Sequence, residues 1–202
     1  ISLTEWEKSQ CGKMYNDFDE DMFNRRVAAK KIFRAYNKTD DTQTEERAEL
    51  MKKLFKSVGK NVWIEPDFHC EFGKNITIED NVYINFGCII LDCAEVRIGA
   101  NTLIGPNAGI YPVNHAIDAN ERINGGCISS PISIGKNCWF GGDVKVLTGV
   151  TIGDNTIIGA GSIVTKDIPS NVIAAGNPCK VIRPITDDDK TEYTQWLKNR
   201  EL

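Results

Sequence analysis

The sequence predicts an all-β solenoid with an N-terminal α-helical hairpin and a short C-terminal helix. Aliphatic or aromatic residues recur every six positions over much of the chain, glycine follows many of them, and a small or medium residue stands two positions before most of them. A six-residue period fits neither an amphipathic helix nor a long flat strand. It fits short strands joined by tight turns in which Gly and Asn tolerate positive φ. A β-sandwich, the alternative, needs strands about 8 to 12 residues apart.

The series shifts by two residues at an insertion at 91–97, restarts, and then keeps its phase across an excursion at 111–131. Residues two apart in a strand face the same side, so both positions of each repeat are predicted to point inward and form one continuous core. The first position is held by Phe72, Ile78, Ile84, Ile90, Ile98, Ile104, Ile110, Ile134, Phe140, Val146, Ile152, Ile158 and Val164. The small inward position is held by Cys70, Ile76, Val82, Cys88, Thr102, Ala108, Cys138, Val144, Val150, Thr156 and Ser162.

The N-terminal residues differ because their apolar residues recur at helical spacing and glycine is nearly absent. One amphipathic helix is predicted at 22–36 and a second at 50–58. Thr42 and Glu45 form a predicted capping box that opens the second helix, and Gly59 is placed to close it. The predicted division is an N-terminal helical region at 1–59, the solenoid at 60–178 with its excursion loop at 111–131, and a C-terminal tail with a polar helix at 179–202.

Composition excludes several classes of protein. The chain has 202 residues and a net charge of −4 with acids and bases mixed, so it offers no basic field for nucleic acid. No apolar run approaches the roughly 20 residues that span a bilayer. Seven cysteines, an odd number without a secretory leader, indicate a reducing, cytoplasmic location. With two histidines, a site that needs several His ligands is difficult to build, and we expect no metal.

His115 is the strongest candidate for chemistry because it begins the excursion from a rigid scaffold. A neutral imidazole there can remove a proton from a hydroxyl, although a plain surface histidine fits the position equally well. His69 neighbours the inward Cys70 and should face outward, in solvent or at an interface. No G-x-S-x-G motif occurs, and no Cys lies close to a His along the chain in a catalytic pattern.

Basic residues gather at the C-terminal end of the repeat. Lys166, Lys180 and Arg183 follow the last coils closely. They fit either the phosphates of a large anionic cofactor or ordinary solvated surface charges.

Several segments resemble the hexapeptide-repeat acyltransferases over nearly the whole chain. These are the hexad at 152–157, the segment at 159–169 and the closing segment at 175–182. The motif Gly12-Lys13-Met14-Tyr15 and the segment Ile64-Glu65-Pro66 narrow the resemblance to the maltose and galactoside O-acetyltransferases. The resemblance implies a left-handed parallel β-helix, a homotrimer with active sites in clefts between subunits, and acetyl-CoA as acetyl donor.

The resemblance also assigns roles to residues. His115 matches the general base for direct attack of a sugar hydroxyl on the thioester, and Asn85 matches the residue that stabilises the oxyanion. The positions that match acceptor-sugar contacts are Asp17, Arg26, Glu71 and Tyr83, together with Asn85. The positions that match coenzyme A contacts are Gly142, Ala160, Thr165, Lys166, Lys180 and Arg183, with Trp139 beside the pantetheine arm.

Four departures from the family pattern bear mainly on the acceptor. Ala116 stands where the pattern has proline after the base, and Cys127 stands where many members have glutamate. Cys93 replaces an acidic residue, for which the adjacent Asp92 is a possible substitute in acceptor binding. Lys180 replaces an arginine, which keeps the charge and loses the bidentate fork.

The sequence therefore favours an enzyme that moves acetyl from acetyl-CoA to a hydroxyl of a maltose, glucose or galactoside type of sugar. Three alternatives stay open. The acceptor could be a non-sugar hydroxyl compound of the antibiotic or serine type, or the solenoid could be non-catalytic. A hydratase of the carbonic anhydrase kind would need three imidazoles per zinc, for which this chain offers His69 and His115 alone.

Overall fold

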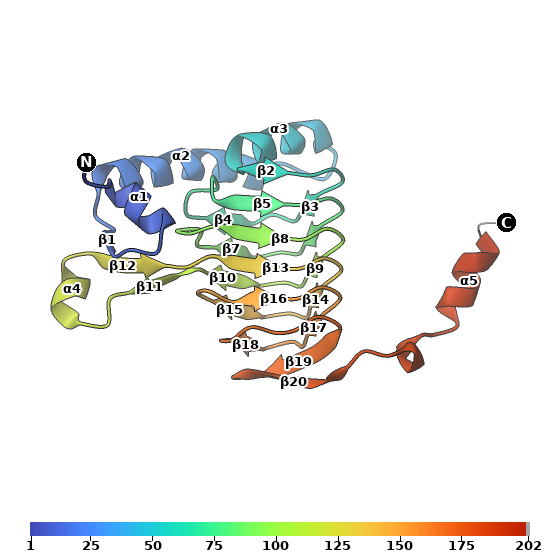
Figure 1. Ribbon diagram of the computed structural model, residues 1–202. Helices are drawn as coiled ribbons and strands as arrows, with labels where there is room; N and C mark the ends of the chain where they lie inside the picture. The colour runs from blue at the N-terminus through green and yellow to red at the C-terminus, as the bar shows by residue number, and fades with distance from the viewer. Residues whose placement is uncertain (201–202) are drawn as a thin grey trace.

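Each coil of the chain contributes short strands to three parallel sheets, which form the faces of a prism (Figure 1). The computed structural model describes residues 1–200. The first sheet contains β2 (Ser57–Val58), β5 (Ile76–Ile78), β8 (Val96–Ile98), β13 (Ile132–Ile134) and β16 (Thr151–Ile152). The second contains β3 (Trp63–Ile64), β6 (Tyr83–Ile84), β9 (Leu103–Ile104), β14 (Trp139–Phe140), β17 (Ile157–Ile158), β19 (Val172–Gly176) and the antiparallel β20 (Cys179–Pro184). The third contains β4 (Phe68–Cys70), β7 (Cys88–Ile90), β10 (Gly109–Tyr111), β15 (Lys145–Leu147) and β18 (Ile163–Val164).

The predicted solenoid and its core are confirmed. Every residue of the six-residue series is buried, and so is every residue of the small inward position. The strand pairs keep these residues in register from coil to coil; Ile84, for example, lies opposite Ile104, which lies opposite Phe140. The solenoid begins at β2, slightly before the predicted boundary, and its last sheet continues through β20.

Phe72 is the one member of the series that does not belong to the solenoid core. Cys70 lies opposite Ile90, so a second two-residue insertion separates β4 from β5. The sequence hides this insertion because Phe72 happens to stand six positions before Ile78. Phe72 packs instead in a separate buried cluster with Tyr15, Met22, Cys93 and Cys127.

An asparagine ladder runs along the corner between the first and second sheets, and we call this the ladder corner. Its members all adopt φ between 55° and 61°. Each side-chain amide except that of the last member donates a hydrogen bond to the next member along the stack, at 2.8 to 3.2 Å. The ladder consists of Asn61, Asn81, Asn101, Asn137, Asn155 and Asn171.

Most glycines that follow the aliphatic positions serve a different purpose from the one predicted; Gly73, with φ 73°, is the exception. Gly99 and Gly141 do not have positive φ, but a Cβ on Gly99 would lie 2.5 Å from the carbonyl carbon of Gly135 in the next coil. Asparagine therefore takes the left-handed conformation, and glycine allows neighbouring coils to approach closely.

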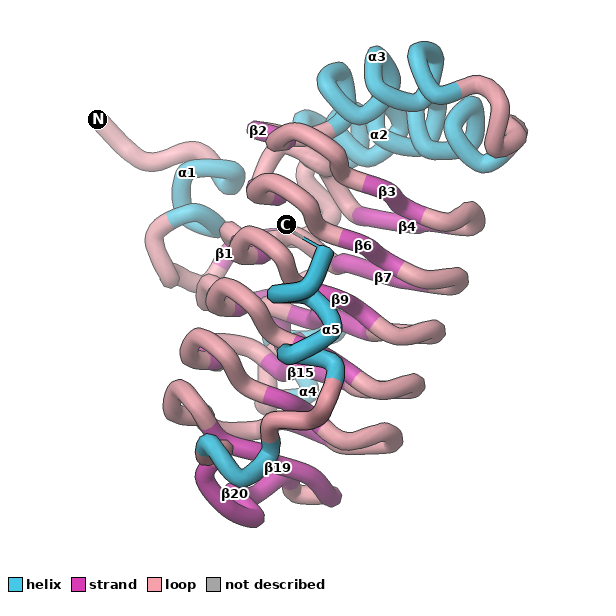
Figure 2. Tube along the Cα trace, turned by 90° about the vertical axis from the view of Figure 1, so that its right-hand side faces the viewer, coloured by secondary structure: helices cyan, strands magenta, loops and turns pink. Residues whose placement is uncertain are grey.

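The helical hairpin consists of α2 (Glu20–Asn37) and α3 (Thr44–Leu54), which cover the N-terminal end of the solenoid (Figures 1 and 2). Its buried side chains, including Phe33, Tyr36 and Leu54, join the solenoid core. An additional helix, α1 (Glu5–Gln10), precedes it and begins with a capping box between Thr4 and Glu7.

The predicted limits of the second helix are wrong at both ends. Gln43 is the N-cap of α3 and makes no side-chain capping bond, because the Thr42 hydroxyl donates to Asp40 within the preceding turn. The helix ends at Leu54, so Val58 lies in β2. Gly59 does not close the helix; it lies against Asp80 of the next coil, which a Cβ would strike.

The predicted excursion loop is an ordered hairpin, which we call the arm. It contains β11 (Val113–His115), α4 (Ala119–Ile123) and β12 (Gly126–Ser129). Strand β1 (Tyr15–Asn16), from the N-terminal region, pairs with β12 and completes a three-stranded antiparallel sheet. Sequence reasoning missed this sheet because its third strand is about a hundred residues away.

The C-terminal segment contains a 3-10 turn (Asp187–Asp189) and α5 (Tyr193–Arg200), which has no buried residue and stands clear of the solenoid in Figure 1. The predicted end of this helix, at 201–202, lies outside the described residues. In residues 1–200 no helix combines the length and the apolar composition needed to cross a membrane.

Asp92, in the insertion at 91–97, forms hydrogen bonds with the backbone of the other insertion, between β4 and β5. One carboxylate oxygen accepts the N–H groups of Glu71 and Phe72, at 3.1 and 2.9 Å, and the other accepts that of Asn75 at 3.2 Å. Asp92 is fully buried, so the expectation that it contacts an acceptor is wrong. Burial raises its pKa to about 7, although these amides oppose the rise.

Asn137 tests the ladder. Asn137→Ala should lower the free energy of unfolding by about 1 to 2 kcal/mol more than Asn137→Gly, because alanine pays the cost of the left-handed conformation and glycine does not. Both variants lose the same two amide hydrogen bonds, so Asn137→Gly is the matched control. Urea unfolding measures the difference, and equal losses would contradict the role of φ.

Asp92 gives stability a pH dependence. The folded protein keeps a proton on Asp92 between about pH 4 and 7, whereas the unfolded chain does not. This contribution to the free energy of unfolding is therefore present at low pH and lost as pH rises towards 7. Relative to Asp92→Asn, which cannot titrate, wild type should lose about 2 kcal/mol between pH 5 and pH 8. Denaturant titrations at both pH values measure this, and parallel losses in the two proteins would refute it.

Candidate active site

The sheet of the arm places three side chains in one row. Its strand order is β1-β12-β11, with Tyr15 opposite Cys127 and Cys127 opposite His115. Directly opposed residues point to the same face, and Ser129 follows on that face two positions after Cys127. The Tyr15 hydroxyl is 2.8 Å from the Ser129 hydroxyl, and both residues are buried. His115 stands at the end of the row and is exposed.

His115 and Cys127 are in contact. The distance from His115 Nδ1 to Cys127 Sγ is 3.4 Å. Sequence reasoning did not pair these residues, because twelve positions separate them along the chain and the arm was expected to be a loop. The two strands are short and β11 shows no alternation of buried and exposed residues, so no local pattern in the sequence revealed the pairing.

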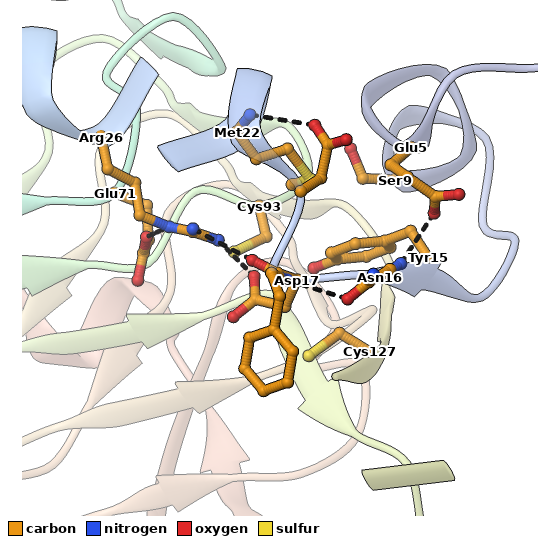
Figure 3. Close-up of polar contacts among 12 residues, drawn as sticks. Glu5, Ser9, Tyr15, Asn16, Asp17, Met22, Arg26, Glu71, Cys93 and Cys127 are labelled. Atoms are coloured by element: carbon orange, nitrogen blue, oxygen red, sulfur yellow. Dashed lines mark hydrogen bonds and ion pairs between the residues drawn. The ribbon is translucent and has the colours of Figure 1, made fainter. Parts of the chain in front are cut away.

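A cluster of charges lies beside this row, as Figure 3 shows. Arg26 Nε donates to Glu71 at 2.7 Å, and the same guanidinium forms an ion pair with Asp17. Burial alone would lower the pKa of Arg26. The negative charges of Asp17 and Glu71 have the larger combined effect, so the pKa of Arg26 is raised. The structure thus brings together three of the predicted acceptor residues, one from the segment before α2, one from α2 and one from the turn after β4.

The thiols and the phenol near this cluster are neutral. Burial raises the pKa of Cys127 to about 11, with the charges of Asp17 and Glu71 adding to the rise. Burial also raises the pKa of Cys93 and of Tyr15 well above their ordinary values. These groups can donate or accept hydrogen bonds, but at neutral pH they carry no charge.

One hollow lies against the arm and another lies at the charged cluster. One, of about 410 Å³, is lined by His115, Met14, Asp118, Glu121 and Ile128, together with neighbouring arm residues. The other, of about 460 Å³, is lined by Asp17, Phe18, Glu20, Phe23 and Arg26. Both are open and large enough for a small polar ligand.

Asn85 stands at a different corner of the prism, between the second and third sheets, and we call this the Asn85 corner. Its side-chain oxygen accepts the N–H of Phe86 at 2.8 Å. Gly142 and Ala160 lie at the same corner in later coils, after β14 and β17. Trp139 and Tyr83 lie on the adjoining outer face of the second sheet, in register through Leu103. The arm leaves from the next corner, after β10, so His115 and Asn85 occupy separate corners of one subunit.

The predicted cofactor cations are exposed. Thr165 and Lys166 follow β18 at the corner from which the arm also leaves, and Lys180 lies in β20. Arg183, also in β20, forms a two-pronged ion pair with Asp189, at 2.7 and 2.9 Å. That pair lowers the pKa of Asp189 to about 2.

His69 faces outward as predicted and packs edge-on against Phe33, with ring centroids 5.2 Å apart. Within residues 1–200, no group of three or more His, Cys, Asp or Glu side chains is arranged to hold a metal ion.

Comparison with known proteins agrees with this architecture. Residues 8–59 match the maltose acetyltransferase hexapeptide capping motif, residues 131–166 the bacterial transferase hexapeptide of six repeats, and residues 95–114 the hexapeptide repeat of succinyl-transferase. A galactoside O-acetyltransferase of Escherichia coli (strain K12) is 45% identical over 192 residues, which cover 95% of each chain.

Solved structures agree as well. A maltose O-acetyltransferase from Clostridium difficile 630 superposes with a TM-score of 0.90 at 44% identity, over 93% of this chain and 100% of the other. A galactoside acetyltransferase in complex with coenzyme A also gives a TM-score of 0.90 at 44% identity, over 95% of this chain and 96% of the other. The fold is thus the left-handed parallel β-helix of hexapeptide repeats, and the chain is an acetyltransferase that belongs to the maltose and galactoside O-acetyltransferase family.

Proposed function

We propose that the protein transfers an acetyl group from acetyl-CoA to a hydroxyl of a sugar of the maltose, glucose or galactoside type. The observation that carries this proposal is the position of His115, an exposed imidazole in contact with Cys127, whose thiol lies within the influence of the charges of Asp17, Arg26 and Glu71. The printed names of the relatives and the coenzyme A bound to one of them support it.

In the proposed reaction His115 removes the proton from the acceptor hydroxyl. The acceptor oxygen attacks the thioester carbonyl and forms a tetrahedral intermediate. The Asn85 amide donates a hydrogen bond to the oxyanion, worth roughly 3 kcal/mol. The intermediate then releases the thiolate of coenzyme A, which takes the proton from the His115 imidazolium. The transfer is direct, and no acyl-enzyme forms.

The charged cluster suits a polyhydroxylated acceptor. The carboxylates of Asp17 and Glu71 accept hydrogen bonds from hydroxyl groups, and Arg26 keeps both in place. Coenzyme A would run along the Asn85 corner, where Gly142 and Ala160 present little side chain, with Trp139 beside its pantetheine arm. Its phosphates would meet Thr165, Lys166, Lys180 and Arg183.

The proposed assembly is a homotrimer, because one subunit holds only part of the site. Asn85 and His115 stand at different corners of the prism. Exposed apolar side chains beside Asn85 offer a surface to a neighbouring copy: Phe86 is 56% exposed, Leu103 49% and Trp139 53%. A cyclic trimer can bring the arm of one subunit to the Asn85 corner of the next.

His115→Ala should lower kcat by at least about a hundredfold, because a general base contributes on that scale, and it should leave the trimer folded. His69→Ala is the matched control, since it removes the other histidine and should keep wild-type kcat. Release of the coenzyme A thiol, followed with a panel of sugars and other alcohols, measures both. An unchanged kcat in His115→Ala would refute the base, and turnover with non-sugar alcohols alone would refute the acceptor class.

Mixed trimers test the shared site. His115→Ala and Asn85→Ala should each be nearly inactive, whereas their co-expression should restore about a quarter of wild-type activity through random mixing in a cyclic trimer. The two purified variants, combined without dissociation, are the control and should stay inactive. Co-expressed variants as inactive as each alone would show that one subunit supplies both residues.

A further inference from the structure

We propose that Cys127 is the positioning residue of His115: its neutral thiol holds the imidazole and determines which ring nitrogen acts as the base. The inference rests on the proposed function, in which His115 is the general base. It concerns a residue whose contact with the base is visible in this chain.

The contact between the two side chains is built into the backbone. Cys127 lies on the central strand of the arm sheet and is directly opposite His115 on one side and Tyr15 on the other. It is 1% exposed and packs in the buried cluster with Tyr15, Met22, Phe72 and Cys93. The sulfur is therefore held in a buried cluster, and it contacts His115 Nδ1 at 3.4 Å.

This contact selects a tautomer. An N–H of imidazole is a stronger donor than a thiol S–H, which is weak in both roles. With the proton on Nδ1 and donated to Cys127 Sγ, the lone pair of Nε2 is free on the outer side of the ring and can accept the proton of a hydroxyl. The reverse arrangement would place the proton on Nε2 and leave no base there. The thiol also gives the Nδ1–H of the imidazolium an acceptor once the proton has been taken.

Cys127 is unsuited to be a nucleophile itself. A thiolate is needed for attack on a thioester, and burial holds the pKa of this thiol at about 11. Its side chain is closed to solvent, and its polar contact is to Nδ1 on the inner side of the ring. The structure thus favours a holding role over an acyl-enzyme.

The neutral partner has a consequence for the pH dependence of the enzyme. The charged groups around the pair are Asp118 and Glu121 in the hollow beside His115, Arg122, which donates to the carbonyls of Ala116 and Ile117, and Asp17, Glu71 and Arg26 beyond Cys127. None of these is the direct partner of Nδ1. A carboxylate in the place of the thiol would favour the imidazolium through its charge and raise the pH at which the base becomes deprotonated.

The experiment compares Cys127→Ala, Cys127→Ser and Cys127→Asp in the full-length enzyme, with kcat and KM measured across pH. Cys127→Ala should lower kcat at least about tenfold while both KM values stay within about twofold of wild type, because the base is misplaced and the substrates are not. Cys127→Ser should restore most of kcat, since a hydroxyl accepts the same bond. Cys127→Asp should move the acid limb of the kcat profile upward by about one pH unit.

Cys88→Ala is the matched control. Cys88 is a fully buried cysteine of the solenoid core on β7, away from the arm, so its loss reports the effect of a missing sulfur on packing alone. Its kcat and acid limb should equal those of wild type even if its melting temperature falls. If Cys127→Asp does not fold, the difference in kcat between Cys127→Ala and Cys127→Ser still tests whether Cys127 positions His115.

Three results would overturn the inference. The first is a Cys127→Ala enzyme that is less stable but has wild-type kcat, and the second is an unchanged acid limb in Cys127→Asp. The third is loss of activity in both Cys127→Ala and Cys127→Ser, together with stoichiometric release of coenzyme A from acetyl-CoA by wild type alone, which would make Cys127 a nucleophile. Activity retained by His115→Ala would instead refute the proposed function, whatever the Cys127 variants do.

Discussion

The stacking of coils at the ladder corner is the constraint on which the rest of the structure depends. Each asparagine of the ladder must adopt a left-handed backbone and point its amide along the stack, so every coil turns at the same place. Close packing follows, because glycines such as Gly99 leave room only for the backbone of the next coil. A register held this firmly lets one coil be interrupted by the arm and resume without loss of phase, as Asn101 and Asn137 show by bonding across the interruption at 2.9 Å.

The stack of coils alone does not bring several polar side chains together, because its side chains either fill the core or point outward separately. The arm supplies what the stack lacks. Its sheet needs a strand from the N-terminal region, and this pairing draws Tyr15 and the following Asp17 towards the turn that carries Glu71. The proposed acceptor site therefore forms where three distant segments meet, while the proposed cofactor residues follow the regular geometry of the prism.

This division explains what sequence could predict. The core positions, such as Ile84 and Phe140, follow from a local period, because each coil repeats the same short-range geometry. Phe72 and Thr42 were misplaced because a coincidental spacing imitated a repeat and a cap, and tertiary contacts decided otherwise. The pairing of His115 with Cys127 depends on the register of an antiparallel sheet whose strands are joined by a helix. No local pattern specifies that register.

Asp92 shows how a residue outside the site can still govern it. Its carboxylate cannot reach an acceptor, yet it holds the N–H of Glu71, whose own carboxylate holds Arg26, which in turn pairs with Asp17. The chain of contacts runs from a fully buried acid to the exposed edge of the site. A buried acceptor of three backbone amides is costly to replace, because its loss leaves those donors unsatisfied. The geometry of the proposed acceptor cluster thus depends on the same insertion that interrupts the hexapeptide period.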